Sequence, residues 1–229
     1  MKAVAPTSPG NVKIDRSRAP MVARGLDFVR PARLIDAIRR GQPVVLCDDE
    51  DRENEGDLVF AAEFASTTLV TQMIREGGGL ICVALAPALV SRFRLKPMVA
   101  KNKCPKGTAF TVSVDAAKGV TTGISARDRA HTIRLLGDRT SRPDDFAAPG
   151  HIFPLAARPG LLAERQGHTE ASVALASLAE LTPAAAICEI LDAEGEAMRR
   201  DALFAFARRH GLLIGTVAEL SAWTGIGHC

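Results

Sequence analysis

Tyrosine is absent from this sequence of 229 residues, tryptophan occurs once, and aromatic residues together make up 4% of it. Proteins that bind single-stranded nucleic acid stack bases on aromatic side chains, so this composition argues against that class. No run of about 18 apolar residues occurs, and we therefore expect no membrane span. The first 20 residues lack the apolar core of a secretory signal peptide, so we expect none.

Cysteine is scarce, and its spacing forms no metal or redox motif. Five cysteines occur, an odd number with no C-x-x-C pair: Cys47, Cys82, Cys104, Cys188 and Cys229. This pattern is typical of free thiols in a reducing compartment. We therefore expect a cytoplasmic protein without disulfides.

Neither sign of charge dominates, because 29 basic residues are balanced by 26 acidic ones and the net charge is +3. Such a balance does not indicate a nucleic-acid partner. An apolar content of 47% is ordinary for a globular protein and allows a hydrophobic core that needs no disulfide.

Patterns typical of helices and strands alternate along the chain without a linker or a repeat. Periodicity and end signals predict helices over residues 30–40, 68–76, 125–136, 169–181 and 201–210. Apolar or alternating runs predict strands over 43–46, 58–62, 80–85, 110–115, 184–190 and 212–217, and a polar stretch predicts a loop over 138–150. We expect a flexible N-terminal arm over 1–20 and, over 21–225, a single α/β (α+β) domain with a mixed β-sheet and helices packed on it.

The segment Asp48–Asp57 carries seven acidic side chains in ten residues. It lies between two predicted strands, so the fold fixes both of its ends and crowds carboxylates whose repulsion a cation or an arginine must relieve. Hard ions such as Mg²⁺ prefer oxygen ligands of this kind. A metal or catalytic role is one interpretation, and a solvated hairpin is the other.

Three further places could carry chemistry, and each also has a structural interpretation. His151 follows a Pro-Gly bend where a loop enters a packed strand, which is a common place for a functional side chain, although a single histidine is often structural. Arg165–Glu170 combines an arginine, a glycine and a hydroxyl at a predicted helix start, which suits a phosphate; the alternative is an ordinary N-cap by Thr169. Glu189 lies in an apolar strand and is either a buried acid–base group or exposed at the strand end.

Other residues in these stretches add to the same chemistry. His168 could bind a metal through one ring nitrogen. The hydroxyl-rich turn Thr121–Ser125 is most simply a helix cap, and Cys82 is most simply a core thiol. A metal, an acid–base set and an anion pocket together suit proton abstraction next to the carbonyl group of a phosphorylated sugar.

Six motifs occur in one order along the chain: D-D-E-D-R-E-N-E-G-D-L-V-F from Asp48, G-G-G-L-I-C from Gly77, T-A-F-T-V from Thr108, G-V-T-T-G-I-S from Gly119, P-G-H-I-F-P from Pro149 and G-H-T-E-A from Gly167. Through this ordered set the sequence resembles 3,4-dihydroxy-2-butanone-4-phosphate synthase over residues 28–223. The resemblance implies conversion of D-ribulose 5-phosphate to L-3,4-dihydroxy-2-butanone 4-phosphate and formate in riboflavin biosynthesis, with Mg²⁺ or Mn²⁺ as cofactor. The implied mechanism is metal-assisted enediol formation, rearrangement and loss of C4.

The resemblance also implies a role for each matching residue. The implied metal ligands are Glu53 and His168. The implied catalytic residues are Arg52, Glu53, Asp57, His151 and Glu189. The implied substrate contacts are Arg52, Asp57, Thr122, Arg165, Gln166, Gly167, His168, Thr169 and Glu189, with Cys82 close by. Members of the family are homodimers with sites near the subunit interface, so we expect a homodimer that acts on a small sugar phosphate.

Four places depart from the family pattern. Ala148 and Ala156 stand where a basic residue is usual, Leu161 stands where a glycine is usual, and Lys103–Lys106 replaces an uncharged stretch. Loss of one charge-assisted contact costs about 1.5–3 kcal/mol, so these changes bear on substrate and phosphate binding. Two alternatives stay open: a divergent paralogue that binds a sugar phosphate without turning it over, and a related metal-dependent lyase or isomerase of another phosphosugar.

Overall fold

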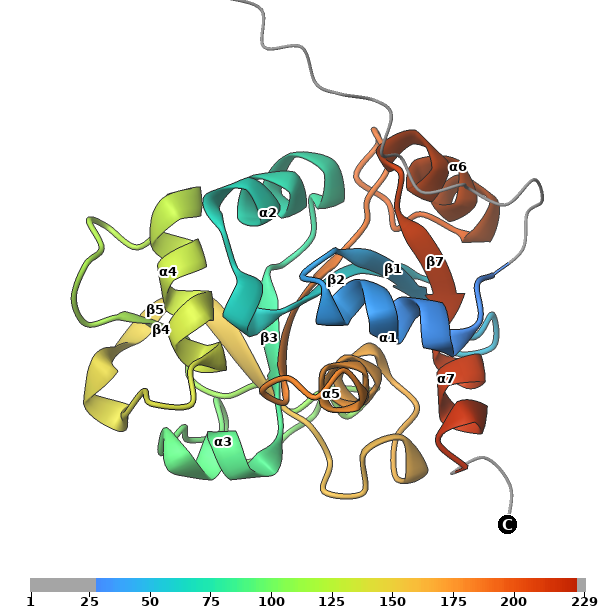
Figure 1. Ribbon diagram of the computed structural model, residues 1–229. Helices are drawn as coiled ribbons and strands as arrows, with labels where there is room; N and C mark the ends of the chain where they lie inside the picture. Colours follow the sequence, from blue (N-terminus) through green and yellow to red (C-terminus); the bar gives the residue numbers. More distant parts are fainter. Residues whose placement is uncertain (1–27, 226–229) are drawn as a thin grey trace, which may run out of the picture.

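The computed structural model describes residues 28–225 (Figure 1). The predicted arm over 1–20 and the stretch 21–27 lie outside the described residues. Within the described range the strands are β1 Val44–Cys47, β2 Gly56–Ala61, β3 Cys82–Leu85, β4 Val114–Ala116, β5 Phe146–Ala156, β6 Ala184–Glu189 and β7 Leu213–Thr216. The α-helices are α1 Pro31–Arg39, α2 Thr67–Gln72, α3 Pro87–Arg92, α4 Ala126–Gly137, α5 His168–Leu178, α6 Arg200–His210 and α7 Val217–Trp223.

The strands form one mixed sheet in the order β4-β5-β3-β6-β2-β1-β7. Strand β1 runs antiparallel to β2 and parallel to β7. Strand β3 runs parallel to β5 and antiparallel to β6, while the β2–β6 and β4–β5 pairs are antiparallel. The α/β class and the mixed sheet predicted from the sequence are therefore confirmed.

Helices cover both faces of the sheet, and the central strands are buried on both sides. Along β1, Val44 and Leu46 pack into one hydrophobic cluster and Val45 and Cys47 into another, as the two-residue period of a strand requires. Helices α1, α5 and α7 contribute to the first cluster and α2, α4 and α6 to the second; in Figure 1, α5 and α7 lie below the sheet and α2 and α6 above it. A strand buried on both faces appears in the sequence as a continuous apolar run, which is how β1 and β6 can be identified.

Local signals set most of the helix ends. Pro31 and Pro87 lie in the first turns of α1 and α3, where a missing N–H group leaves no hydrogen bond unmade. Ser125 caps α4 by accepting a hydrogen bond from the backbone N–H of Asp128, as its S-A-R-D pattern predicts. Gly211 ends α6 in the left-handed conformation. None of the helices described is long and apolar enough to cross a membrane.

The strand predicted over 110–115 is wrong in its extent. Phe110 and Thr111 form only isolated bridges, and the regular strand begins at Val114. Thr111 directs both its backbone N–H and its hydroxyl to the carbonyl oxygen of Pro154, and the backbone N–H of Ala156 donates to the carbonyl oxygen of Ala109, so this stretch pairs only briefly with β5.

The loop predicted over 138–150 is wrong in its second half, because β5 begins at Phe146. Asp115 pairs with Ala147, whereas the preceding Val114 pairs with Ile152, so the register shifts between these two pairs. The Pro-Gly dipeptide that indicates a loop in the sequence instead forms an irregularity within a strand.

Two short helices were not predicted from the sequence, and the N-cap of one helix was assigned to the wrong residue. Helices α3 and α7 have six and seven residues, too few to give a clear periodic pattern. Helix α5 starts one residue before Thr169, with Gly167 as its N-cap and no side-chain cap bond. The alternative in which Thr169 is an ordinary N-cap is therefore wrong.

Candidate active site

The acidic segment, the start of α5 and the end of β6 surround one cavity of about 260 Å³. Its lining residues are Arg52, Glu53, Glu55, Asp57, Cys82, Thr108, Phe110, Leu155, Arg165, His168, Thr169, Ile187 and Glu189. Seven of the residues that the resemblance implicates lie in this lining: Arg52, Glu53, Asp57, Arg165, His168, Thr169 and Glu189. The structure thus brings together parts of the sequence that are far apart.

Sheet register places the two ends of the acidic segment beside the rest of the site. Strands β1 and β2 are paired so that Leu46 lies opposite Asp57, and β2 and β6 are paired so that Asp57 lies opposite Glu189. Directly opposite residues on neighbouring strands have Cβ atoms roughly 5 Å apart. The ring Nε2 of His168, the first residue of α5, lies 3.1 Å from the carbonyl oxygen of Leu46 and so fixes that helix to β1.

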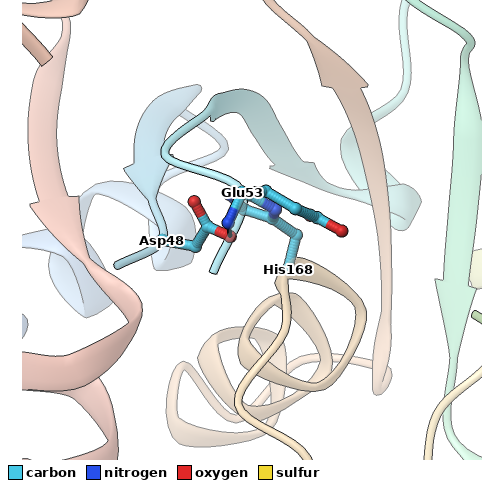
Figure 2. A group of neighbouring side chains, drawn as sticks. All are labelled: Asp48, Glu53 and His168. Atoms are coloured by element: carbon cyan, nitrogen blue, oxygen red, sulfur yellow. Dashed lines mark hydrogen bonds between the residues drawn. The ribbon is translucent and has the colours of Figure 1, made fainter. Parts of the chain in front are cut away.

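Asp48, Glu53 and His168 form a group that could hold a metal ion. One ligand atom from each lies within 4.8 Å of the others, and Figure 2 shows the three side chains side by side. A carbonyl oxygen can only accept, so Nε2 of His168 carries the proton toward Leu46 and Nδ1 keeps its lone pair. Burial lowers the pKa of His168, so the ring is neutral and its 3.9 Å approach to Asp57 is not an ion pair. Two carboxylates and a neutral imidazole suit a divalent cation.

Asp48 was missed by the sequence reasoning, although it is the best-connected residue of the acidic segment. Its buried Oδ2 accepts hydrogen bonds from the guanidinium of Arg52 at 2.7 Å and from the backbone N–H of Glu53 at 3.2 Å. Its Oδ1 accepts from the backbone N–H of Glu55 at 2.9 Å. One signal could have identified it: Asp48 directly follows a buried strand, where a short carboxylate can bond to the backbone of the turn.

Arg199 supports the same segment from the C-terminal half of the chain. Its guanidinium donates to the carbonyl oxygens of Glu53 at 2.5 Å and Asn54 at 3.0 Å. Asn54 has a φ of 55°, in the left-handed region where asparagine is tolerated. The backbone around Glu53 is thus held from two sides, by Asp48 within the segment and by Arg199 from outside it.

Asp57 is a buried carboxyl group among other carboxylates. Burial raises its pKa well above the usual value, and Glu189 and Glu55 raise it further. Its Oδ1 has no hydrogen-bond partner among the described residues. Glu189 is held in place by the backbone N–H of Leu80, which donates to Oε2 at 2.9 Å. Burial also raises the pKa of the Cys82 thiol, which therefore stays protonated beside them.

Two guanidinium groups meet at the opposite end of the cavity. A Cβ atom added to Gly167 would collide with the guanidinium of Arg165 and lie 3.0 Å from that of Arg52, so both groups face this glycine. Gly167 is the N-cap of α5, whose free N–H groups carry partial positive charge. Two cations beside a helix N-terminus suit an anion, and the anion site expected for this stretch stays a prediction.

Neighbouring side chains hold Arg165 in this position. Its guanidinium donates to the buried carboxylate of Glu170 at 2.5 Å, to the hydroxyl of Thr108 at 3.2 Å and to the carbonyl of Lys106 at 3.1 Å. The Lys106 ammonium donates to the carbonyl of Arg52. The lysine-rich departure from the family pattern therefore borders the anion site. At another departure, Leu161 keeps a left-handed backbone with φ 47°, a conformation that favours glycine.

Four implicated residues do not line the cavity. His151 and Thr122 lie elsewhere, and Gln166 and Gly167 are absent from the lining although Arg165 and His168 on either side of them are present. His151 shares β5 with Leu155, which does line the cavity. Four residues of strand separate their Cα atoms by about 13 Å, too far for His151 to touch a substrate that His168 contacts in the same chain.

Comparisons with known proteins identify the family to which the chain belongs. A model of the 3,4-dihydroxy-2-butanone 4-phosphate synthase family matches residues 32–223. The 3,4-dihydroxy-2-butanone 4-phosphate synthase of Chromobacterium violaceum is 48% identical over 189 residues, which cover 82% of this chain and 90% of the relative. Riboflavin biosynthesis protein RibBA of Mycobacterium tuberculosis is 51% identical over 193 residues, 83% of this chain but 45% of that protein.

Solved structures show the same fold. A crystal structure of 3,4-dihydroxy-2-butanone 4-phosphate synthase in complex with two magnesium ions superposes with a TM-score of 0.85 at 42% identity, covering 87% of this chain and 98% of the other. RibBX, a two-domain 3,4-dihydroxy-2-butanone 4-phosphate synthase from A. baumannii, gives a TM-score of 0.83 at 44% identity, covering 87% of this chain and 59% of the other.

The buried carboxyl group of Asp57 has a measurable consequence for stability. Its folded pKa lies above the unfolded value, so its ionisation opposes folding, and the free energy of unfolding falls as pH rises from the unfolded toward the folded pKa. In EDTA, Asp57→Asn should raise the free energy of unfolding at neutral pH by about 1–3 kcal/mol. The gain should vanish below about pH 4, where the carboxyl is protonated in both states. Urea-induced unfolding at a series of pH values measures the difference in the free energy of unfolding between Asp57→Asn and the wild type. The control is Asp51→Asn, which removes the same charge at an exposed position.

Proposed function

Since the chain belongs to the 3,4-dihydroxy-2-butanone 4-phosphate synthase family, we propose that its cavity converts D-ribulose 5-phosphate to L-3,4-dihydroxy-2-butanone 4-phosphate and formate. This is a lyase reaction of riboflavin biosynthesis. The observation that carries the proposal is the content of one cavity: a cation-binding group, a buried carboxyl with a raised pKa, and two guanidinium groups at a helix N-terminus. The cytoplasmic location expected from the cysteine pattern stays a prediction.

Mg²⁺ or Mn²⁺ is the proposed cofactor. A related synthase has been solved with two magnesium ions, and the Asp48, Glu53 and His168 side chains of this chain offer a suitable donor set. We propose Glu53 and His168 as ligands, with Asp48 holding the backbone that carries Glu53. When bound, the ion supplies Lewis-acid stabilisation of negative charge developing on a substrate oxygen.

The remaining side chains of the cavity would orient the substrate and move protons. Arg165 is the proposed phosphate ligand, because three hydrogen bonds already fix its orientation and two of its five N–H groups have no partner among the described residues. Asp57 and Glu189 lie on adjacent strands at the sugar end. A carboxyl group with a raised pKa is a stronger base than an exposed aspartate, so Asp57 is suited to accept a proton next to the sugar carbonyl.

A homodimer would account for the position of His151. Its ring pairs with Asp115, and its side chain is 42% exposed in the middle of β5. We infer that the second copy of the chain brings its own His151 to the cavity, and that Thr122, which is exposed in the same region, approaches in the same way. Each active site would then contain the metal group of one chain and the histidine of the other.

The metal-binding proposal predicts which carboxylates the reaction requires. Glu53→Gln or His168→Ala should reduce formate release from D-ribulose 5-phosphate by about 10²–10³-fold, because stabilisation by a bound ion is worth several kcal/mol. EDTA should abolish the activity of the wild type, and Mg²⁺ should restore it. Glu50→Gln is the matched control, because Glu50 lies in the same segment but is exposed and paired with Arg200.

Three outcomes would contradict this proposal. If both variants keep full activity, the metal ligands are wrong. If the wild type binds ribulose 5-phosphate but releases no formate at any metal concentration, the chain is a non-catalytic paralogue. Formate release from a different phosphosugar in a substrate panel would identify a related lyase.

The shared-site proposal predicts complementation between two inactive variants. His151→Gln and His168→Ala should each be inactive alone. After unfolding and refolding together, half of the dimers should be mixed, and each mixed dimer should contain one complete site, which gives about a quarter of the wild-type activity. If every site lies within one chain, the mixture should stay inactive. Analytical ultracentrifugation of each sample confirms that dimers have formed.

A further inference from the structure

His151 and Asp115 form an ordered pair outside the cavity. The ring Nδ1 of His151 lies 2.7 Å from Oδ2 of Asp115, and the backbone N–H of His151 donates to Oδ1 of the same carboxylate at 2.9 Å. A carboxylate on Nδ1 fixes both the tautomer and the direction of an imidazole ring, which leaves Nε2 as the free nitrogen. Asp115 sits at the register shift between β4 and β5, where it pairs with Ala147 although the preceding Val114 pairs with Ile152.

Gly123 packs directly against this pair. It is buried and has a φ of +90°. A Cβ atom there would lie 2.6 Å from Cγ of Asp115 and 2.7 Å from Nδ1 of His151, closer than any side chain allows. The backbone at Gly123 therefore packs directly against the hydrogen-bonded side chains of Asp115 and His151, and only glycine fits at this position.

Asp128 holds that turn in place. Its buried Oδ2 accepts three hydrogen bonds: from the backbone N–H of Thr121 at 3.0 Å, from the Thr121 hydroxyl at 2.6 Å and from the backbone N–H of Gly123 at 3.2 Å. Asp128 itself lies in the first turn of α4, which is anchored in the core by Ile133 and Leu136. A rigid helix is thus connected through one carboxylate to the turn behind His151.

We propose that Asp128 is a positioning residue for His151, acting through Gly123. It holds the Thr121–Gly123 turn against Asp115, so that the imidazole ring is fixed in one orientation before it reaches the substrate. The same three bonds fix the backbone on either side of Thr122. This inference rests on the proposed role of His151 in the reaction, and it assigns a task to a carboxylate that lines no part of the cavity.

Substitutions of two glycines in this stretch distinguish loss of His151 positioning from the effect of backbone strain alone. Gly119 and Gly123 both have positive φ in the same stretch, at 79° and 90°. A Cβ at Gly119 would meet His131, at 3.0 Å from Nε2, whereas a Cβ at Gly123 would meet Asp115 and His151. Gly119→Ala and Gly123→Ala therefore place alanine in a similar left-handed backbone conformation, but only Gly123→Ala also collides with the Asp115–His151 pair.

Gly123→Ala should lower kcat for formate release by about 10²-fold, because a catalytic group displaced by about 1 Å loses that much rate. KM should stay near the wild-type value, since the substrate is held by the other side chains. Gly119→Ala should keep kcat close to that of the wild type. Asp128→Ala should act like Gly123→Ala, and Asp128→Asn, which keeps an oxygen to accept the same bonds, should recover most of the lost rate.

A spectroscopic measurement tests the positioning itself. In ¹⁵N-labelled wild type, the His151 ring should give the signature of a single tautomer with hydrogen on Nδ1. Gly123→Ala and Asp128→Ala should average the two tautomers, and Gly119→Ala should not. Circular dichroism and thermal unfolding of each variant confirm folding, and Asp128→Ala, with Asp128→Asn as its rescue control, carries the test if Gly123→Ala does not fold.

The outcomes distinguish this inference from the function on which it rests. If His151→Gln is inactive while Gly123→Ala and Asp128→Ala match Gly119→Ala in kcat and in the ring spectrum, the positioning role is wrong. If His151→Gln keeps full activity, the catalytic role of His151 is wrong, and the ring spectra alone decide whether Asp128 orients it.

Discussion

The carboxylate of Asp48 accepts hydrogen bonds from the backbone N–H groups of Glu53 and Glu55 and pairs with Arg52, and its side chain is fully shielded from solvent. These bonds turn the acidic segment back over the end of β1. The same strand fixes His168 through the carbonyl of Leu46. Both parts of the metal-binding group are therefore positioned by one strand, although they are far apart in the sequence.

The cavity combines groups that a stable fold would normally keep apart. Carboxylates of Asp57 and Glu189 face each other on adjacent strands, and the guanidinium groups of Arg52 and Arg165 face the same glycine. Like charges at such distances oppose folding. The two guanidinium groups are balanced within the chain, because Arg52 pairs with Asp48 and Glu53 and Arg165 pairs with Glu170. Asp57 has no such partner in the described part of the chain, and burial together with Glu189 raises its pKa.

Much of this could be predicted from the sequence, because it depends on local patterns. The acidic segment, the Arg165–Glu170 anion site and most element positions are encoded within short stretches. The importance of Asp48 could not be predicted, because seven acidic residues look alike until the turn that connects β1 to β2 is known. The separation of His151 from the cavity could not be predicted either, because a Pro-Gly pair gives the same signal in a loop and in a β-strand irregularity.

In this account the negative charge of Asp48 is needed to shape the metal-binding group, and an uncharged residue cannot replace it. Titration of Mn²⁺ followed by electron paramagnetic resonance, on the wild type and on Asp48→Asn, tests it most directly. We predict that Asp48→Asn keeps its fold by circular dichroism but binds Mn²⁺ about 10–100-fold more weakly, as expected when a supporting or direct ligand is lost. Equal Mn²⁺ affinity in the two proteins would contradict the account.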